Sequence, residues 1–428
     1  KNPQKLIPGK RLFQMNIQAL PTAAVRPVYE NRQRSGTENR PAPTCTRADR
    51  KKCIYPGRLY GHCPAGCFYV CLDANQPAER LNRILDTLKA DLMIADKESL
   101  DLAVGISFSG EILFLEDLKS LPDDAEQQLL ASIRRQAADT DPLYGIFTSG
   151  STGVPKGVVV SHRSVIDFIQ HFTDLFHITQ DDVIGNQAPF DFDVSVKDIY
   201  SALKTGATME IIPKKLFSIP TGLLDYLATG NHHSHLGRFR LCIITTLKGF
   251  TYRIPSHLNK ILFSGEVMPV KHLNIWRSYL PDALFVNLYG PTEITCNCTY
   301  YVVDREFEPE PPFPSEYPFP TNSILLDEVT GWSQNPDKTA NSVWQEPLWL
   351  WATTGIQNEL QAFVQNPLNP CYPEIIYRTG DLACYGRDGL LYFNGRKDFQ
   401  IKHMGHRIEL GEIELALETV EGVDQGGD

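Results

Sequence analysis

The chain has 428 residues, of which 42% are hydrophobic and 21% are charged, and its formal net charge is -10. This length predicts two or three domains, and the composition is that of a globular protein and not of a disordered chain. The acidic balance disfavours a general nucleic-acid binder, because such proteins present a basic face to phosphates. No apolar run reaches the roughly 18 residues that cross a bilayer, and the amino-terminal residues lack the apolar segment of a signal peptide. We therefore expect a cytoplasmic protein with no nucleic-acid partner and no membrane insertion.

Helix and strand patterns alternate along the chain. Apolar residues at helical spacing begin at Glu79 and lead into a short strand that ends near residue 96. Residues 164–176 predict an amphipathic helix, residues 284–290 predict a buried strand that ends at a turn, and residues 407–420 predict a helix entered through Gly411. This alternation predicts α/β layers.

The strongest local signal lies at residues 144–165. An apolar strand at 144–147 leads into a run of hydroxyl and glycine residues, and a lysine and a second apolar strand follow. Backbone amides freed by glycine form an anion nest and the lysine neutralises charge, so this segment predicts a polyphosphate-binding loop. The spacing differs from that of a Walker A loop. The candidate phosphate-binding residues are Thr148, Ser149, Gly150, Ser151, Thr152, Gly153 and Lys156.

The loop TSGSTGVPKG resembles the signature of the adenylate-forming enzymes. These include acyl-CoA synthetases, luciferases, the amino-acid adenylation domains of nonribosomal peptide synthetases and D-alanyl carrier protein ligases. Four further motifs follow in the family's order: FSGEVMP at 263–269, NLYGPTE at 287–293, YRTGDLA at 377–383 and GRKDFQIKHMGHRIELGEIE at 395–414. The resemblance implies a large multi-layer α/β AMP-binding domain over residues 1–397, followed at 398–428 by the start of a small α+β C-terminal domain, truncated.

The resemblance also implies that the chain binds ATP and Mg²⁺ through particular residues. Tyr289 would stack on adenine, Asp381 would accept the ribose hydroxyls and Arg396 would contact the nucleotide. Thr292 would contact the phosphate, and Glu293 would hold Mg²⁺, which prefers oxygen ligands. The remaining implied sites are Gly265, Glu266 and Gly290 for the nucleotide, Asp398 for the hinge between domains, and Lys402 for the thiol-transfer step.

The substrate class depends on PFDFDVSVKDIYSAL at residues 189–203. Asp193 resembles the aspartate that pairs with the α-ammonium of an amino acid, and a buried ammonium needs such a partner because an unpaired buried charge costs several kcal/mol. Asp191 and Asp198 are interpreted as a turn carboxylate and a helix-surface carboxylate. By the same resemblance the pocket includes Ser264, Leu288 and Cys296, together with Val194, Lys197, Leu262 and Asn297.

The function implied is activation of an amino acid by ATP and its transfer to the phosphopantetheine thiol of a carrier protein. One alternative is an acyl-CoA or aryl-acid ligase, which Asp193 disfavours because those substrates carry no ammonium. A second alternative is a remnant that only binds nucleotide. The family places a lysine near the end of the small domain. The sequence stops at Asp428, and Lys402 lies too near the hinge-like Asp398 to be that lysine, so slow adenylation is expected.

In three stretches, at residues 40–64, 229–240 and 331–360, the apolar residues follow neither helical nor strand spacing. Four of the five tryptophans fall in the last stretch. Plausible codons for residues 331–360, shifted by one base, give text close to the missing family motif. We therefore hypothesise compensated frameshifts, and we expect residues 229–240 and 331–360 to lack sheet pairing and to expose tryptophans. His232, His233 and His235 are not expected to bind a metal. The ten cysteines are expected to be reduced thiols.

Overall fold

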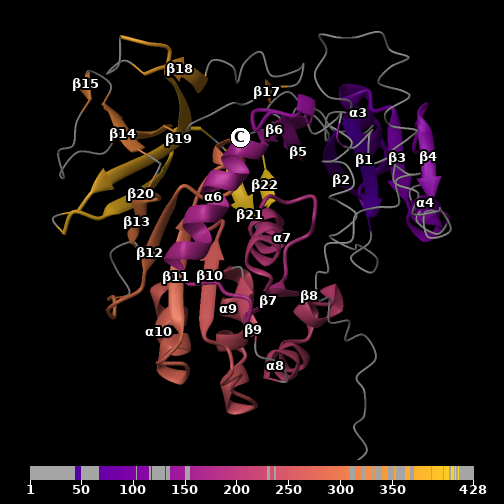
Figure 1. Cartoon of the computed structure of the whole chain (residues 1–428). Helices are drawn as coiled ribbons and strands as arrows, with labels where there is room; N and C mark the ends of the chain where they lie inside the picture. The colour runs from indigo at the N-terminus through magenta and orange to yellow at the C-terminus, as the bar shows by residue number, and fades with distance from the viewer. Residues whose placement is uncertain are drawn as a thin grey trace, which may run out of the picture.

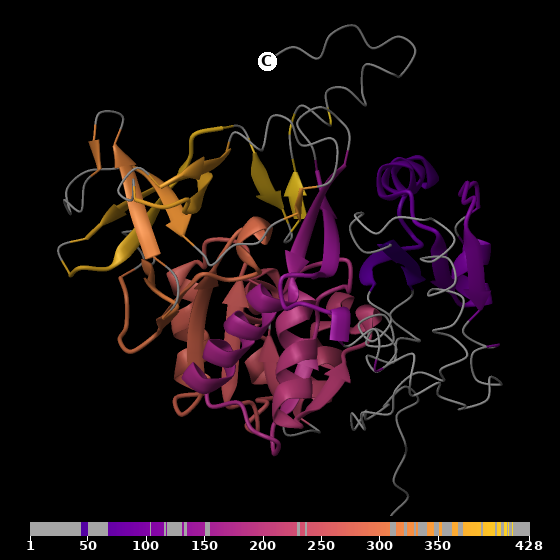
Figure 2. The same cartoon turned by 45° about the horizontal axis from the view of Figure 1, so that its top comes forward.

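The computed structural model describes the following residues: 44–49, 67–102, 104–114, 117, 131, 135–149, 155–228, 232–235, 238–308, 314–320, 323–328, 331–332, 340–345, 351–352, 362–366, 371–386, 388–398, 400–403, 406–408, 410 and 413. These residues form α/β layers around two large sheets, as the alternating sequence pattern predicts (Figures 1 and 2). None of the helices in these ranges is both long enough and apolar enough to cross a membrane.

The first sheet is built from early residues and lies on the right in Figure 1. Strands β1 to β5 pair in parallel, whereas β6 pairs antiparallel with β5 and with β17. In the order β17-β6-β5-β2-β1-β3-β4, its strands are Trp351–Ala352, Lys156–Ser161, Pro142–Thr148, Phe68–Asp73, Thr44–Asp49, Leu92–Ala95 and Glu111–Phe114.

The second sheet has a parallel part and an antiparallel part. The parallel strands, in the order β8-β7-β9-β10-β11, are Thr208–Ile211, Val183–Asn186, His232–His235, Lys260–Ser264 and Leu284–Tyr289. The carboxyl ends of parallel strands meet at one edge, where α/β proteins place their ligands. The segments that follow β7, β10 and β11 contain three of the sequence motifs, so this edge is where the candidate site is expected.

An antiparallel part continues the second sheet from β11. Its strands are β12 (Thr299–Val302), β13 (Pro314–Pro318), β20 (Leu391–Arg396), β19 (Ile375–Tyr385), β16 (Ala340–Gln345), β14 (Ser323–Glu328) and β15 (Gly331–Trp332), with β18 (Phe363–Gln365) on β19. β19 and β20 carry the later nucleotide motifs and reach the end of β11 through this pairing. A separate two-stranded sheet follows, formed by β21 (Ile401–His403) and β22 (His406–Ile408).

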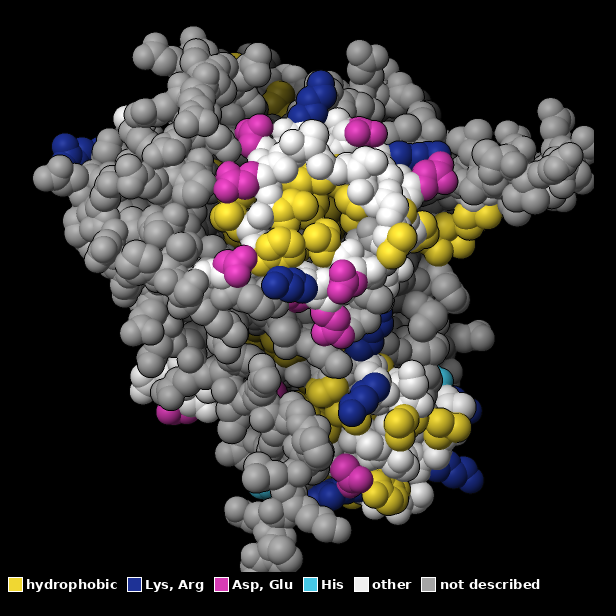
Figure 3. Space-filling view, turned by 90° about the vertical axis from the view of Figure 1, so that its right-hand side faces the viewer, with side chains coloured by type: hydrophobic (Ala, Val, Ile, Leu, Met, Phe, Trp, Pro, Cys, Tyr) yellow, Lys and Arg dark blue, Asp and Glu magenta, His cyan; other side chains and the backbone are white. Residues whose placement is uncertain are grey.

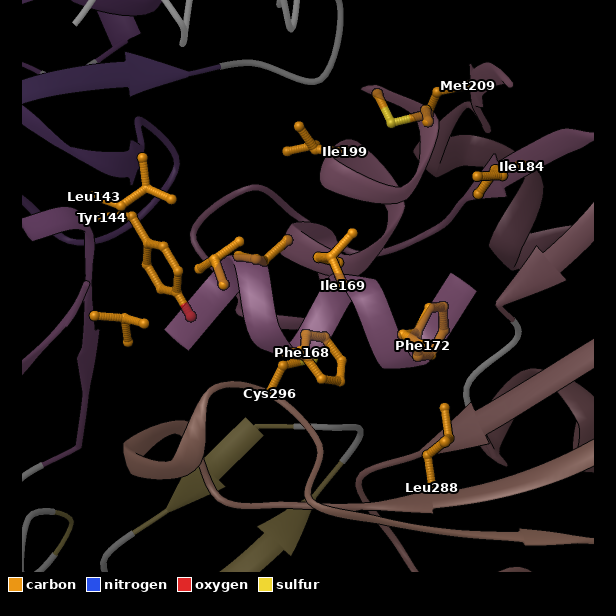
Figure 4. Packing of buried hydrophobic residues seen from close by; sticks show 14 of the residues in the cluster. Leu143, Tyr144, Phe168, Ile169, Phe172, Ile184, Ile199, Met209, Leu288 and Cys296 are labelled. Carbon is orange, nitrogen blue, oxygen red and sulfur yellow. The ribbon is translucent and has the colours of Figure 1, made fainter. Parts of the chain in front are cut away.

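Helix α6 (His162–Leu175) confirms the amphipathic helix predicted from the sequence. It begins where Ser161 Oγ accepts a hydrogen bond from the amide of Ser164 at 3.2 Å, which satisfies an amide at the helix start. Phe168 and Phe172 lie one turn apart and enter the main core, and their ring centroids are 5.4 Å apart (Figure 4). The other α-helices within the described residues are α3 (Ala78–Leu88), α4 (Lys97–Leu102), α7 (Val194–Thr205), α8 (Pro220–Ala228), α9 (Arg238–Thr246) and α10 (Val270–Tyr279).

A second core lies between the parallel strands and α8, α9 and α10, and Trp276 is at its centre. Its indole is fully buried, lies edge-on to Phe250, and donates a hydrogen bond from Nε1 to the carbonyl of Leu241 at 3.0 Å. We expect Trp276→Ala to lower the free energy of unfolding by about 3 to 5 kcal/mol, because a large cavity remains and the buried hydrogen bond to Leu241 is lost. Urea unfolding followed by circular dichroism measures this. Lys271 is exposed on the same helix, so Lys271→Ala should change the free energy of unfolding by less than about 0.5 kcal/mol. An equal loss of stability in both variants would contradict the buried position of Trp276 in this core.

The expectation that the unpatterned stretches lack sheet pairing is wrong. β9 pairs with β7 and β10, and β16 pairs with β14 and β19. The reason is that ladder hydrogen bonds join main-chain groups, so an extended segment can fill a gap between two strands whatever its side-chain period. The exposure of the four clustered tryptophans concerns side chains outside the described residues.

The outer face of the first sheet carries a group of apolar side chains ringed by charged ones (Figure 3). Near β4, the edge strand of this sheet, Val104 is exposed, whereas Ile106, Phe108 and Ile112 are partly buried against the core of the sheet.

Candidate active site

The β5–β6 hairpin holds the predicted phosphate loop. Thr148 is the last residue of β5 and lies opposite Lys156, the first residue of β6. The two strands therefore bring the hydroxyls of Thr148 and Ser149 and the ammonium of Lys156 to one end of the hairpin, and all three residues are half-buried. The other four predicted residues, Gly150, Ser151, Thr152 and Gly153, lie outside the described residues.

The end of β10 contributes Ser264, Gly265 and Glu266, all half-buried. Ser264 lies opposite Leu288 in the β10–β11 register. Gly265 has a φ of +95°, a conformation that residues with a side chain rarely adopt, and nothing lies within 4 Å of where its Cβ would be. The glycine therefore lets the chain turn away from the sheet beside open space.

The end of β11 lies beside the β19–β20 pair, and a network of polar side chains joins them. Tyr289 donates its hydroxyl hydrogen to Asp381 Oδ2, and Arg396 Nη1 donates to Asp381 Oδ1 at 2.6 Å. Arg396 also donates from Nε and Nη2 to the two carboxylate oxygens of Asp398, at 2.6 and 2.7 Å. Four residues assigned separately from sequence thus form one continuous network.

Asp381 is held in place by its own turn. It is 5% exposed, and its amide donates to Thr379 Oγ1 at 3.0 Å. Gly380 has a φ of +75°, and a Cβ there would lie 3.0 Å from Arg396 Nη2. Thr379 was not predicted as a site residue, although its position inside the YRTGDLA motif was a signal for it.

The segment after β11 folds back tightly on its own strand. A Cβ at Gly290 would lie 2.5 Å from Cα of Asn297 and 2.7 Å from the carbonyl oxygen of Cys296, so only glycine fits. Thr295 and Cys296 have φ values of 47° and 75°, which reverse the chain, and Cys298 then donates its amide to the carbonyl of Tyr289 at 2.8 Å. This loop places Asn297 close to the end of β11.

Thr292 and Glu293 lie on the short helix η5 (Thr292–Ile294) within this loop. Thr292 is half-buried and Glu293 is 2% exposed. The pair offers a hydroxyl oxygen and a carboxylate, which are the donors that hard divalent cations prefer. The donor chemistry of these two residues therefore fits the Mg²⁺ site implied by the sequence.

Asp193 caps the start of α7 but makes no side-chain hydrogen bond to the first turn. The residue is 9% exposed, and its charge acts on Lys197 and Cys296. The interpretation of Asp198 as a helix-surface carboxylate is wrong, because Asp198 is fully buried and accepts a hydrogen bond from Asn186 Nδ2 at 2.8 Å. Helix α7 is buried on nearly all sides, so a charged residue in the motif need not mark an exposed face.

Asp191 lies in the turn before α7, as predicted, and accepts a hydrogen bond from Gln76 Nε2 at 2.9 Å. Burial, with the nearby charge of Asp73, raises the pKa of Asp191 to about 6. A raised pKa means that the folded state binds the proton more tightly, so the free energy of unfolding should fall as the pH rises from about 4 through 6.

Asp191→Asn removes this ionisation while its side-chain oxygen can still accept from Gln76. We expect the variant to be more stable than the parent at pH 7.5, by on the order of 1 kcal/mol, and equal to it near pH 4. Thermal unfolding at both pH values measures this. The exposed Asp181→Asn is the control, and a gain that does not depend on pH would show that the ionisation of Asp191 is not its cause.

A cluster of hydrogen-bonded side chains lies near the start of α7 and consists of Lys197, Cys296 and Asn297. Lys197 Nζ donates to Asn297 Oδ1 at 3.1 Å, and the Cys296 thiol donates to the same oxygen at 3.4 Å. Burial lowers the pKa of Lys197 and raises that of Cys296. Cys296 and Leu288 are both 2% exposed and belong to the main core (Figure 4). The predicted substrate residues Cys296 and Leu288 thus lie in the packed core, and Cys296 contacts Asn297 there.

Lys402 lies in the middle of β21, opposite Arg407 of β22. Its side chain is outside the described residues. Its predicted role in thiol transfer stays a prediction.

Comparisons with known proteins identify the family of the chain. Residues 59–339 match the family model described as "AMP-binding enzyme". The chain is 32% identical over 373 residues to bacitracin synthase 1 of Bacillus licheniformis, covering 86% of this chain and 7% of the synthase. It is 29% identical over 372 residues to the D-alanine–D-alanyl carrier protein ligase of Staphylococcus aureus, covering 86% of this chain and 71% of the ligase.

Among solved structures, the fold is similar to that of the Vibrio cholerae adenylation domain AlmE, determined in complex with glycyl-adenosine-5'-phosphate. The TM-score is 0.77 at 20% identity, and the match covers 92% of this chain and 77% of AlmE. The chain spans a small part of some relatives, such as 38% of the tyrocidine synthase 1 of Brevibacillus parabrevis.

Proposed function

Since this chain belongs to the family of AMP-binding enzymes, we propose that it activates an amino acid with ATP and passes the aminoacyl group to the phosphopantetheine thiol of a carrier protein. One observation carries this proposal. The loop 290–298 joins the nucleotide-type network around Asp381 to the buried carboxylate of Asp193, whose charge acts on Cys296 and Lys197. A carboxylate in that place is the partner that an α-ammonium needs when it leaves water.

The proposed chemistry has two steps. A carboxylate oxygen of the amino acid attacks the α-phosphorus of ATP, and the bond to pyrophosphate breaks. The thiol sulfur then attacks the carbonyl carbon of the aminoacyl-adenylate, and AMP leaves. Neither step needs a nucleophilic side chain, so the residues of the site act by positioning the reactants and by neutralising charge.

Particular side chains serve this positioning. Asp381 and Arg396 hold the nucleotide, and Tyr289 offers an aromatic face at the strand end. Thr148, Ser149 and Lys156 would bind the phosphates, and the β5–β6 hairpin supports this role because it brings the three residues to one end. Glu293 and Thr292 would hold Mg²⁺, which when bound neutralises phosphate charge.

The names of the relatives support the same substrate and partner. The S. aureus ligase is named for D-alanine and a D-alanyl carrier protein, and AlmE was determined with a glycyl-adenylate. The proposal keeps the division into a large domain at residues 1–397 and a small domain from 398. It also keeps a cytoplasmic location, where ATP is available.

The test is pyrophosphate exchange into ATP. A panel of the common amino acids should drive exchange, and a matched panel of fatty and aryl acids should not. Exchange driven by fatty or aryl acids alone would contradict the amino-acid assignment. If no acid of either panel drives exchange and the protein still binds AMP, the result would support a chain that only binds nucleotide.

A further inference from the structure

Lys197 is unusual among the lysines that the structure describes, because it is the only one that is buried. It is 1% exposed and lies one turn after Asp193 on α7. A buried ammonium is costly unless hydrogen bonds and an opposite charge stabilise it. A lysine in this place therefore calls for a partner.

The partners supplied by the chain are incomplete. The ammonium has three N–H donors, and within the described residues its one hydrogen bond goes to Asn297 Oδ1, a neutral acceptor. Within the described residues, no carboxylate oxygen lies within 4.0 Å of Lys197 Nζ, which is the distance that an ion pair requires. The charge of Asp193 acts on it only from a longer distance.

The balance of charge becomes worse when an amino acid is bound as proposed above. Asp193 then pairs with the α-ammonium of the substrate. The α-carboxylate becomes bonded to phosphorus, so the site holds two ammonium groups and one carboxylate near α7. A second carboxylate would restore the balance, and the substrate's side chain is the part of the ligand that remains to supply it.

We propose that the amino acid activated by this chain carries a carboxylate on its side chain, and that Lys197 and Asn297 bind that carboxylate. The inference rests on the proposed function. Lys197 would donate its two remaining N–H groups. Asn297 Oδ1 accepts from both Lys197 and Cys296, which orients the amide so that its Nδ2 group faces away from them as a further donor. An acidic substrate thus satisfies groups that a neutral one leaves buried and unpaired.

The experiment measures amino-acid-dependent pyrophosphate exchange with aspartate, glutamate, asparagine, glutamine and alanine. The parent protein should favour aspartate or glutamate over its own amide by at least about 10-fold in kcat/KM, because the amide leaves the Lys197 charge without a partner. Comparison of aspartate with glutamate then gives the length of the side chain.

Lys197→Met keeps the length of the side chain and removes its charge. It should lower kcat/KM for the preferred acidic amino acid by about 100-fold and bring that acid and its amide within about 3-fold of each other. Lys204→Met, at the exposed last turn of the same helix, should leave both values unchanged. Lys197→Gln is the second variant, and AMP binding by calorimetry shows whether each variant is folded.

The outcomes separate the two proposals. If alanine or another neutral amino acid is preferred and Lys197→Met keeps that ranking, Lys197 is an internal counterion of Asp193 and this inference is wrong while the proposed function stands. If no amino acid drives exchange, the proposed function fails and this inference fails with it. If both Lys197 variants bind AMP but the parent's preference for acids persists in them, another residue reads the side chain and the inference is wrong.

Discussion

Asp193→Ala should abolish amino-acid-dependent pyrophosphate exchange while AMP binding stays within about 2-fold of the parent. Asp193 is buried at the start of α7, whereas the hydrogen bonds of Asp381 with Tyr289 and Arg396 join β11 to β19 and β20. Loss of a buried partner for the substrate's ammonium costs about 3 to 5 kcal/mol, which lowers kcat/KM for the amino acid by more than 100-fold. Exchange kinetics and calorimetry with AMP measure the two effects separately.

The matched control is Asp191→Asn, two residues earlier in the same motif. Its side chain accepts a hydrogen bond from Gln76 and is assigned no role in binding the substrate, so exchange should stay within about 2-fold of the parent. Persistent exchange of the same amino acid in Asp193→Ala would show that this carboxylate does not bind the ammonium, and that the substrate class has been wrongly assigned.

Asp381→Ala should weaken AMP binding and raise the KM for ATP by about 100-fold. The substitution removes the acceptor of charge-assisted hydrogen bonds and leaves Arg396 paired with Asp398 alone. Hydrogen bonds that involve a charged group are each worth about 1.5 to 3 kcal/mol, so two of them account for a loss of this size. Calorimetry with AMP and exchange at varied ATP measure it.

Two further variants test the source of this effect. Tyr289→Phe keeps the aromatic face and frees Asp381 Oδ2, so AMP affinity should change by less than about 5-fold. Asp388 lies in the turn between β19 and β20, and its exposed carboxylate pairs with Arg305. Asp388→Ala should therefore not change AMP affinity. Unchanged affinity in Asp381→Ala would exclude this carboxylate from the nucleotide site.

Local patterns predicted much of the fold. The helix at α6 and the strand at β11 follow from the pattern of apolar residues, because this signal acts within a few residues. The strand at β9 was not predictable in this way, since its place depends on β7 and β10, which are distant in sequence. The burial of Asp198 was missed for the same reason, because packing around α7 comes from several elements.

The site was predictable as a set of residues but not as a set of contacts. The motifs identified Tyr289, Asp381, Arg396 and Asp398 one by one, whereas their hydrogen-bond network depends on the pairing of β19 with β20 beside β11. The hydrogen bond of the buried Lys197 ammonium to Asn297 likewise depends on the loop after β11, so the sequence alone did not predict it.

The tight return of the chain from Tyr289 to Cys298 has a thermodynamic consequence. At one end of this loop Tyr289 donates a hydrogen bond to Asp381, and at the other end Asn297 accepts one from Lys197. Because the backbone of 296–298 lies too close to Gly290 to leave room for a Cβ there, we expect a shift at one end of the loop to move the other. Ligands at the two ends should therefore bind cooperatively, and linkage requires that ATP change the affinity for the amino acid by the same factor as the amino acid changes the affinity for ATP.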